Sequence, residues 1–562
     1  MLSHNGTINT VTRIRGMKLI PGSGRRHYGA TVGICLTMVA LIAGIVGCTG
    51  TPGVQIRDWY DLDAVRDNLG GSYILMNDLD SSTASYEELA SPTANEGRGW
   101  EPIGSEESPF VGSFDGQGHE IRDLFINRPD EVYVGLFGYA GEAGVIRNVG
   151  VVNTDVTGYQ GGGGLVFLNF GTVSNCYVTG SVNGEEAAGG LVAGNSGNVS
   201  SCYSAASVTS EGFAGGLVGL NMGNVSNSYS TGSVIGDREV GGLVGWNLDG
   251  TVNDCHSTCS VTGSYAVAGL AGLNNGTVSN SYSTGNVVGD MHVGGLVGYS
   301  EFGTVSDSYS TCTVTGSEYV GGLVGTDERG TVSNSYSTGR VTGADYVGGL
   351  VGINPHGNGT VSNSYSTGNV IGNGHVGGLA GVSEGTVSSS YSTGNVTGNG
   401  IVGGLLGACF GTVSNSYSAG SVSGHWSVGG LVGRHMGNVS YSYSTGSVIG
   451  DQEVGGLVGF SVGNVSDSYS TGNVDGDVDV GGLVGARFGS STVSNSFWDT
   501  QTSGQATSDG GTGKTTAEMR DIATFSGAGW DITAVADPGT RNPSYIWNIV
   551  DAVTYPFLSW QP

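Results

Sequence analysis

The sequence has little positive charge, little proline and almost no long helical pattern. Only two lysines occur in 562 residues, Lys18 and Lys514, and 19 Lys and Arg stand against 47 Asp and Glu. A net charge of −28 repels phosphate backbones, so we expect no nucleic acid among the partners. The 107 glycines lack a Gly-X-Y period, which excludes a collagen triple helix.

The abundant residues are those of strands and turns. Val, Tyr and Thr favour strands, and Gly, Asn and Ser favour the turns that connect them. We therefore predict an all-β fold. A repeat array can be long and remain one folded unit, so the length does not require several domains.

The first 48 residues have the composition of an export signal. Their five basic residues precede an uncharged apolar run at 30–47, and the segment has no acidic residue. A positive segment followed by an apolar one is the layout of a secretory signal. Translation could start at Met1 or at Met17, which would shorten the basic part.

The apolar run ends in Ile45-Val46-Gly47-Cys48, which resembles the lipobox of bacterial lipoproteins. The resemblance implies a lipid on Cys48, with 1–48 as signal peptide and an exported, membrane-anchored lipoprotein at the cell envelope or cell surface. One alternative is an uncleaved signal anchor, since the 18 apolar residues at 30–47 can just span a bilayer. Another is a twin-arginine signal at Arg25-Arg26.

A glycine pair, or its Ala-Gly variant, recurs thirteen times. The intervals are 26 or 27 residues, with one of 29. The pairs begin at residues 163, 189, 215, 241, 268, 294, 321, 348, 377, 403, 429, 455 and 481. This period predicts a parallel β-helix (β-solenoid) of about 13 coils of 26–27 residues, with the equivalent strands of successive coils about 4.8 Å apart and a rod of roughly 60 Å.

Each unit contains three short strand candidates. In the unit that begins at Val293 they are VGGLVG, TVSDSYS and TVTG, separated by turn residues. We expect the glycine pair at a sharp corner or where two backbones approach closely, because a Cβ would clash there.

The middle strand alternates between two faces. In TVSNSYS at 277–283, Val278, Asn280 and Tyr282 share one side and three serines share the other. Because Val is apolar, we expect the first set to face inward and its tyrosines to stack as a core column. That column would hold Tyr177, Tyr203, Tyr229, Tyr282, Tyr309, Tyr336, Tyr365, Tyr391, Tyr417, Tyr443 and Tyr469, with His256 and Phe497 as substitutes.

The ends of the array differ from its middle, as the exposed sheet edges of a solenoid require. We predict an N-terminal cap at 49–130, with an amphipathic helix that carries Trp59, Leu62, Val65 and Leu69 on one stripe. The solenoid would follow at 131–498 and a Trp-rich C-terminal cap at 499–562.

The units VGGLVG…GTVSNSYSTG resemble the GLUG repeat of bacterial surface proteins. These include adhesins and the repeat regions that accompany immunoglobulin-A-cleaving metallopeptidases. The flanks FDGQGHEIRDLFI and GGTGKTTAEM…YPFLSW resemble the same family, so the resemblance covers about residues 55–562. It implies a secreted or surface-attached β-solenoid, often adhesive, and does not imply catalysis.

Three motifs approach known chemistry without completing it. His119-Glu120 begins like H-E-x-x-H, but Asp123 replaces the second His and the stretch alternates like a strand, so the peptidase motif is incomplete. Residues 511–515, GTGKT, resemble a phosphate loop, but Ser508 stands where its first Gly belongs, which favours a loop in the cap. We therefore expect no catalytic residue and no enzyme activity.

The third motif is a spacing of three acids. Asp475, Asp477 and Asp479 are two residues apart, as in calcium loops, and Asp237, Asp290 and Asp451 take the same corner in other coils. We expect solvated acids and no cofactor, with weak Ca²⁺ sites along this corner as the alternative.

Six cysteines follow the signal. Cys176 and Cys202 take the same position in adjacent coils, on the face we expect to point outward. A separation of about 4.8 Å fits the Cα distance of a disulfide, and an oxidising envelope permits one. We predict this bond, with free thiols as the alternative. Cys255, His256 and Cys259 have a spacing like that of zinc ligands, but neighbours on a strand point to opposite faces.

These observations predict a non-enzymatic cell-surface lipoprotein, an adhesin or a rigid structural and interaction module. Its partners would be the membrane, through the lipid, and host, cell-surface or matrix glycans or proteins. The alternatives are a carbohydrate-binding or polysaccharide-degrading β-helix protein, and an ice or mineral binder that uses flat Ser and Thr columns. Recognition is expected where the copies vary, such as Ser300-Glu301-Phe302, Cys312 and the residues before the glycine pair, and in the two caps.

Overall fold

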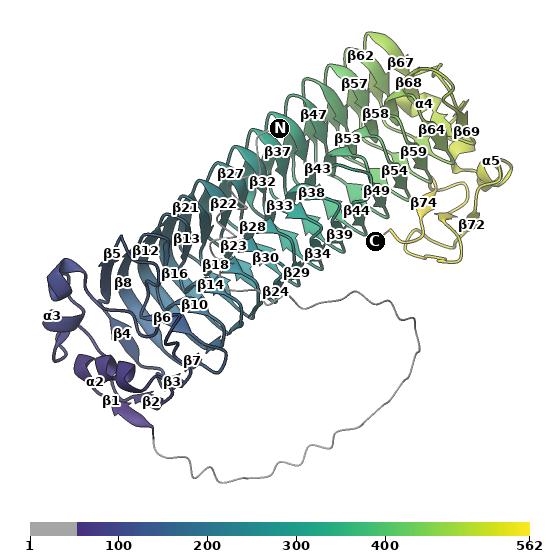
Figure 1. Cartoon of the computed structure of the whole chain (residues 1–562). Coiled ribbons are helices and arrows are strands. Elements are labelled where there is room, and N and C mark those ends of the chain that lie inside the picture. The colour runs from purple at the N-terminus through teal and green to yellow at the C-terminus, as the bar shows by residue number, and fades with distance from the viewer. Residues whose placement is uncertain (1–52, 562) are drawn as a thin grey trace, which may run out of the picture. The chain divides into compact units, whose positions relative to one another are not determined.

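Residues 53–561 form a stack of coils, a parallel β-solenoid of about 15 turns with little helix (Figure 1). The computed structural model describes residues 53–561, and Val54–Pro562 form one compact unit. The predicted signal peptide, the lipobox with Cys48 and both start sites lie outside the described residues.

One coil contains five short strands rather than the predicted three. In the coil that begins at Met291 they are β32 (Met291–Gly294), β33 (Val297–Glu301), β34 (Thr304–Ser306), β35 (Tyr309–Ser310) and β36 (Thr313–Thr315). The chain turns inside VGGLVG, and again at Asp307, whose φ of 51° is left-handed. We name the sheets by their strands: sheet A contains β34, sheet B contains β35 and β36, sheet C contains β33 and sheet D contains β32.

Successive coils pair in parallel and in register, as predicted. Val305 pairs with Val332 in sheet A, Tyr309 with Tyr336 in sheet B, and Val320 with Val347 in sheet D. Sheet A has 17 strands, sheet C has 14 and sheet D has 13, so the array continues beyond the thirteen glycine pairs.

The core consists of aliphatic columns that run along the rod. In the coil of β32–β36, Val293, Leu296, Val297, Val305 and Val314 are all fully buried, and equivalent residues repeat in the neighbouring coils. Burial of such a side chain contributes about 1.5–3 kcal/mol, so the interior of every coil stabilises its neighbours.

The prediction of inward-facing tyrosines is wrong. Val278 is buried, but Asn280 has a left-handed backbone (φ 48°) and an exposed side chain, so the alternation inverts beyond it. Ser281 and Ser283 are therefore buried, and Tyr282 lies half-buried on the outer side. The tyrosines do stack, with ring centroids 4.8–5.0 Å apart and planes within 8°.

The serines of the buried column that contains Ser281 are hydrogen-bonded to one another and to the backbone. The Ser281 hydroxyl donates to the carbonyl of Ser279 at 2.7 Å, and the backbone N–H of Ser281 donates to Ser308 Oγ at 3.1 Å. Because the same bonds recur from coil to coil, a hydroxyl can occupy the interior at little cost.

A second buried column consists of asparagines at the end of sheet C. Asn169, Asn195, Asn221, Asn247 and Asn274 follow one another, and each Nδ2 donates to the Oδ1 of the next at 2.8 Å. In the next coils the same position holds Ser300, Asp327, Asn354 and Ser383. The ladder of amides is therefore interrupted in the middle of the rod.

The N-terminal cap continues sheet A. Strands β1 (Val54–Ile56), β2 (Ser72–Leu75), β3 (Ser113–Asp115) and β7 (Val145–Arg147) pair in parallel in that order. The predicted helix forms as α2 (Trp59–Asp63) and a 3₁₀ turn (Ala64–Asn68), and Trp59, Leu62 and Val65 are fully buried. The predicted helix is therefore confirmed, although it is divided into a short α-helix and a 3₁₀ turn.

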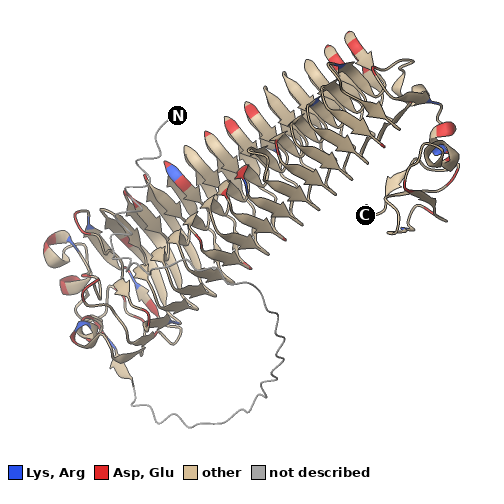
Figure 2. Cartoon of the chain, turned by 45° about the vertical axis from the view of Figure 1, so that its right-hand side comes forward, with Lys and Arg blue, Asp and Glu red and all other residues tan. Residues whose placement is uncertain are grey.

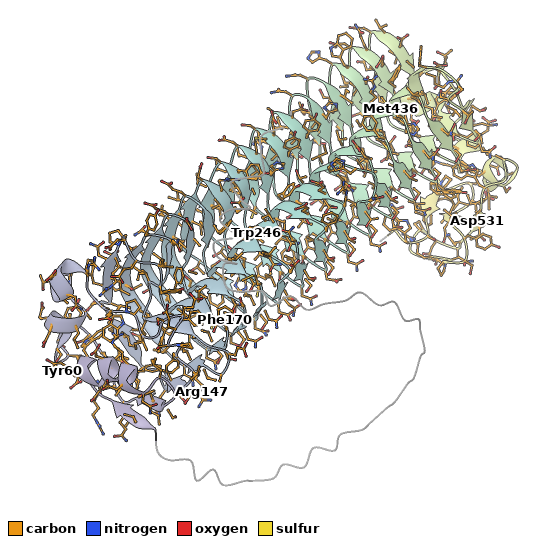
Figure 3. All side chains as sticks on the ribbon, viewed as in Figure 1. Tyr60, Arg147, Phe170, Trp246, Met436 and Asp531 are labelled. Atoms are coloured by element: carbon orange, nitrogen blue, oxygen red, sulfur yellow. The ribbon has the colours of Figure 1, made fainter. Side chains whose placement is uncertain are left out.

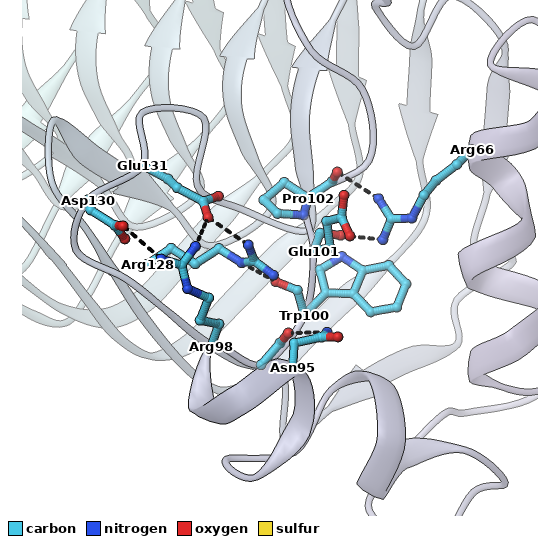
Figure 4. Close-up of polar contacts among 10 residues, drawn as sticks. Arg66, Asn95, Arg98, Trp100, Glu101, Pro102, Arg128, Asp130 and Glu131 are labelled. Atoms are coloured by element: carbon cyan, nitrogen blue, oxygen red, sulfur yellow. Dashed lines mark hydrogen bonds and ion pairs between the residues drawn. The ribbon is translucent and has the colours of Figure 1, made fainter.

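Arginines fasten the loops of this cap (Figure 4). Arg128 donates from Nε to the carbonyl of Trp100 at 2.9 Å and forms an ion pair with Glu131 at 2.8 Å. Arg66 donates to the carbonyl of Pro102 at 2.7 Å, and its guanidinium lies 4.9 Å from the Trp100 ring centre. Many of the few positively charged side chains of the protein therefore lie in this cap.

The C-terminal cap covers the end and one side of the last coils. Strand β71 (Thr512–Lys514) pairs in parallel with β70 (Phe497–Asp499), so residues 511–515 end the stack as a strand rather than as the predicted loop. The tail beyond it packs Trp530, Trp547 and Leu558 in one cluster with Tyr443 and Tyr469. Here, and only in these last described coils, the tyrosine column is buried.

Candidate interaction site

The predicted disulfide pair lies inside the rod. Cys176 and Cys202 occupy the interior position that serines hold elsewhere, so their predicted outward orientation is wrong. The backbone N–H of Cys176 lies 3.4 Å from Cys202 Sγ, and both thiols are free in the structure. Adjacent coils thus bring the two residues together, and the disulfide stays a prediction.

The acidic corner alternates acids with neutral residues. The N–H of Ser264 donates to the carbonyl of Asp237, and the N–H of Asp290 to that of Ser264, so a serine coil separates the two acids. Asp451 lies between Asp477 and His425, whose Nδ1 is 2.6 Å from the Asp451 carboxylate. Within residues 53–561, His, Cys, Asp and Glu form no group of three placed to hold a metal ion.

The variable positions before the glycine pair lie at the corner between sheets D and C, whereas Ser300 and Cys312 are fully buried, so the prediction that these two take part in recognition is wrong. The second residue before the glycine pair has a left-handed backbone in several coils, with φ between 45° and 57°. This column contains Glu239, Ala266, His292, Tyr319 and Tyr346. Their side chains face the outer residues of sheet C, among them Trp246, which is labelled in Figure 3. We name Tyr265, His292, Tyr299, Tyr319, Thr326, Glu328 and His356 the corner cluster.

His292 is the centre of the corner cluster. Its ring stacks on Tyr319 with centroids 4.8 Å apart, and it meets the rings of Tyr265 and Tyr299 edge-on at 4.9 and 5.0 Å. Its Nδ1 lies 2.7 Å from Thr326 Oγ1. Burial lowers the pKa of His292 to about 4, so the imidazole is neutral at pH 7.

The rim of the corner cluster is acidic. The hydroxyl of Tyr299 donates to Glu328, and His356 Nε2 lies 3.5 Å from the same carboxylate. Glu301 pairs in register with Glu328 from the adjacent coil. Burial and the Glu328 carboxylate raise the pKa of Tyr299, so this phenol remains a hydrogen-bond donor.

This arrangement suits recognition better than nucleophilic catalysis. Thr326 and His292 form a hydroxyl–imidazole pair, but Thr326 is only 3% exposed, so a substrate cannot reach its oxygen. The accessible parts are ring edges, hydroxyls and carboxylates, which are groups that bind polar partners. The sequence predicted that recognition would fall on variable positions, and it did not show that two sets of them lie together.

The N-terminal coils contain a hollow of about 650 Å³ that the sequence did not reveal. Two carboxylates line it: Asp123 accepts from Asn153 Nδ2 at 2.8 Å, and Asp155 accepts from the Ser181 hydroxyl at 2.9 Å. A bulge between β8 (Gly150–Gly158) and β12 (Tyr177–Gly184) forms its floor. The sequence feature that corresponds to this bulge is one extra residue, since β8 has nine residues and β12 has eight.

The repeat matches a known motif in four places. The GLUG motif matches residues 214–235, 289–315, 316–342 and 424–449. The chain therefore contains repeated GLUG motifs. Each matched segment contains one interior turn of the solenoid, with strands of sheet B and either side of the glycine corner.

Two curated proteins resemble parts of this GLUG-repeat chain. A "Putative Gly-rich membrane protein" of Evansella cellulosilytica is 36% identical over 121 residues, 21% of this chain and 13% of that protein. Halomucin of Haloquadratum walsbyi is 38% identical over 151 residues, 25% of this chain and 2% of halomucin. The chain thus spans a small part of each relative's length.

One solved structure also resembles it, described as that of a "putative immunoglobulin A1 protease from Bacteroides ovatus". The identity is 22%, the TM-score is 0.30, and the match covers 50% of this chain and 74% of the other. Among residues 53–561, no helix has the length and hydrophobicity needed to cross a membrane.

Proposed function

We propose that this GLUG-repeat solenoid is a non-enzymatic cell-surface lipoprotein that acts as an adhesin or as a rigid interaction module. The observation that carries the proposal is the parallel pairing that repeats from coil to coil, with fully buried aliphatic columns. A rod of this kind holds the corner cluster at fixed spacing and resists bending.

Attachment to a membrane is supported by two sources. The lipobox-like Ile45–Cys48 and the apolar run at 30–47 are typical of a lipoprotein, and one relative is named a membrane protein. The excess of acids opposes contact between the rod and anionic surfaces.

Cys48→Ser is expected to abolish lipid attachment and to release the protein from the membrane fraction. Metabolic labelling with a fatty acid and cell fractionation measure both effects on the full-length chain. Cys312→Ser, a change at a buried cysteine of the rod, is the matched control and should leave labelling unchanged. Membrane retention of the Cys48 variant with labelling intact would contradict the lipobox reading.

Disruption of the corner cluster is expected to weaken binding by about tenfold, because a few central aromatic contacts dominate most interfaces. The test compares wild type with His292→Ala/Tyr319→Ala on glycan arrays, matrix proteins and host cells. His425→Ala, a change at an exposed His of another coil, is the control. Equal binding by all three forms would remove the corner cluster from the proposal.

A carbohydrate-degrading role is the second candidate, favoured by Asp123 and Asp155 in the N-terminal hollow. Paired carboxylates are the groups that glycoside hydrolysis uses. Incubation of the full-length chain with a panel of acidic polysaccharides decides between the two roles: oligosaccharide release that disappears in Asp123→Asn would replace the non-enzymatic proposal.

A further inference from the structure

The outer face of sheet B has almost no charge. Four side chains of each coil point outward there, for example Tyr309, Thr311, Thr313 and Thr315. Eight successive coils, from Tyr203 to Thr397, contain one charged residue on this face, Arg340. We name this surface the neutral face. Acidic residues instead gather on the turns along one edge of the coils and at the ends of the rod (Figure 2).

Many polar groups of the neutral face are already used within it. Ser233 donates to Ser207 at 3.2 Å, and the N–H of Asn395 donates to Asn369 Oδ1 at 3.1 Å, in each case from one coil to the next. The tyrosine rings cover one another face to face, so only their edges remain open. A sugar ring needs an aromatic face to stack on, so this surface does not fit a glycan platform.

Apolar groups border the same surface. Ile235 is 52% exposed and Val288 is 46% exposed, both in the outermost column of sheet B. Along the other border runs the half-buried tyrosine column. Depletion of charge together with exposed aromatic and aliphatic side chains is typical of a protein interface.

The C-terminal tail of the chain shows that this surface packs against protein. Tyr417, Tyr443 and Tyr469 are 7%, 5% and 1% exposed beneath the tail, and Trp547 lies 5.8–6.0 Å from two of these rings. Further along the tail, the ring of Trp560 lies 6.3 Å from the ring of Tyr391. From Tyr203 to Tyr365 the rings of the same column are not buried, and none of them belongs to the cluster that the tail forms.

We propose that the neutral face joins two copies of this chain side by side, in antiparallel orientation. Eight coils at about 4.8 Å, with strands of about 20 Å, provide roughly 800 Å² on each copy, which is the size of a standard stable interface. Elsewhere the acidic surface opposes contact between two copies, and here it does not.

The antiparallel orientation follows from the C-terminal cap. The cap stands on the tyrosine column at one end of the neutral face. In a parallel pair both caps would meet at the same level, whereas in an antiparallel pair each cap lies beyond the partner's opposite end. The contact is then isologous and closes at two copies.

The test is the mass of the full-length chain, in a neutral detergent that keeps segment 30–47 in solution, by analytical ultracentrifugation over a range of concentrations. Wild type is expected to form a dimer. Thr311→Glu/Thr338→Glu places acids at the centre of the face and is expected to raise the dissociation constant by at least about tenfold. Ser306→Glu/Ser333→Glu, in the same two coils on sheet A, is the matched control.

Orientation is measured by spin labels at Thr209 and Thr397, near the two ends of the neutral face. A short distance between Thr209 of one copy and Thr397 of the other supports the antiparallel pair, and a short distance between two Thr209 labels overturns it. A monomer at every concentration, or a dimer that withstands the Thr311/Thr338 change while the variant keeps its β circular dichroism, overturns the proposal. Capture of a glycan by a wild-type monomer, abolished by Thr311→Glu/Thr338→Glu, would assign the face to that ligand and overturn the dimer.

Discussion

Asp327→Asn is expected to stabilise the protein and to remove a pH dependence. Asp327 is fully buried in the column where Asn169 to Asn274 form a ladder of amides. Neither of its carboxylate oxygens, nor the amide of Asn354 in the next coil, makes a hydrogen bond to another described residue. An Asn at 327 supplies the missing Nδ2 donor and no charge.

The direction of the pH dependence follows from proton binding. Burial raises the pKa of Asp327 to about 8, against about 3.9 in an unfolded chain. Between these values the folded state holds a proton that the unfolded state has released. The free energy of unfolding therefore falls as pH rises through this window, by up to about 5 kcal/mol, and is flat below it.

Urea unfolding of the full-length chain at several pH values measures this effect. At pH 7 the Asn variant is expected to be more stable than wild type by about 4 kcal/mol, and the two converge below pH 4. Asp307→Asn is the control, because Asp307 is exposed at a corner where the neighbouring coils have Asn280 and Asn334. A constant difference between Asp327→Asn and wild type across the pH range would refute the explanation.

Gly322→Ala is expected to destabilise the rod by more than about 4 kcal/mol. A Cβ at Gly322 would lie 2.1 Å from the carbonyl oxygen of Gly349 in the next coil and 2.3 Å from the buried Ser337 hydroxyl. Both neighbours are fixed by the parallel pairing, so the coils would have to separate. The backbone conformation itself is not the cause, since Gly322 has no positive φ.

The same unfolding experiment tests this change. Gly70→Ala is the control, because its Cβ would meet nothing closer than 3.8 Å. It should change the stability little, whereas Gly322→Ala should lower the urea midpoint strongly or unfold the neighbouring coils. If the two variants had equal stability, close backbone contact would not be the reason for the repeated glycines.

The period and the parallel stacking were predictable from sequence, because both follow from the spacing of the glycine pair. The orientation of Tyr282 was not, because one left-handed residue, Asn280, inverts the strand alternation beyond it. The error carried over to Cys176 and Cys202, whose side was inferred from the same alternation. A corner formed by a residue other than Gly or Pro, such as Asn280, is harder to recognise in a sequence than one formed by Gly or Pro.

The candidate site was predictable only as a set of variable positions. His292 and Tyr299 are seven positions apart, and their contact depends on the angle between sheets D and C. Glu328 and His356 come from still later coils, so their meeting depends on the register of the whole stack. The N-terminal hollow depends on a bulge, which a single sequence shows only as one extra residue.

The C-terminal tail fastens the last tyrosines, and the N-terminal cap closes the opposite end, while each interior coil meets its neighbours through nearly the same surfaces. A whole coil of 26 or 27 residues can therefore be inserted or lost between the caps without a new kind of contact. Nearly identical repeats in a gene recombine readily with one another. The number of coils, and with it the length of the rod, can therefore change by one coil at a time between generations. The two caps and the fold stay the same.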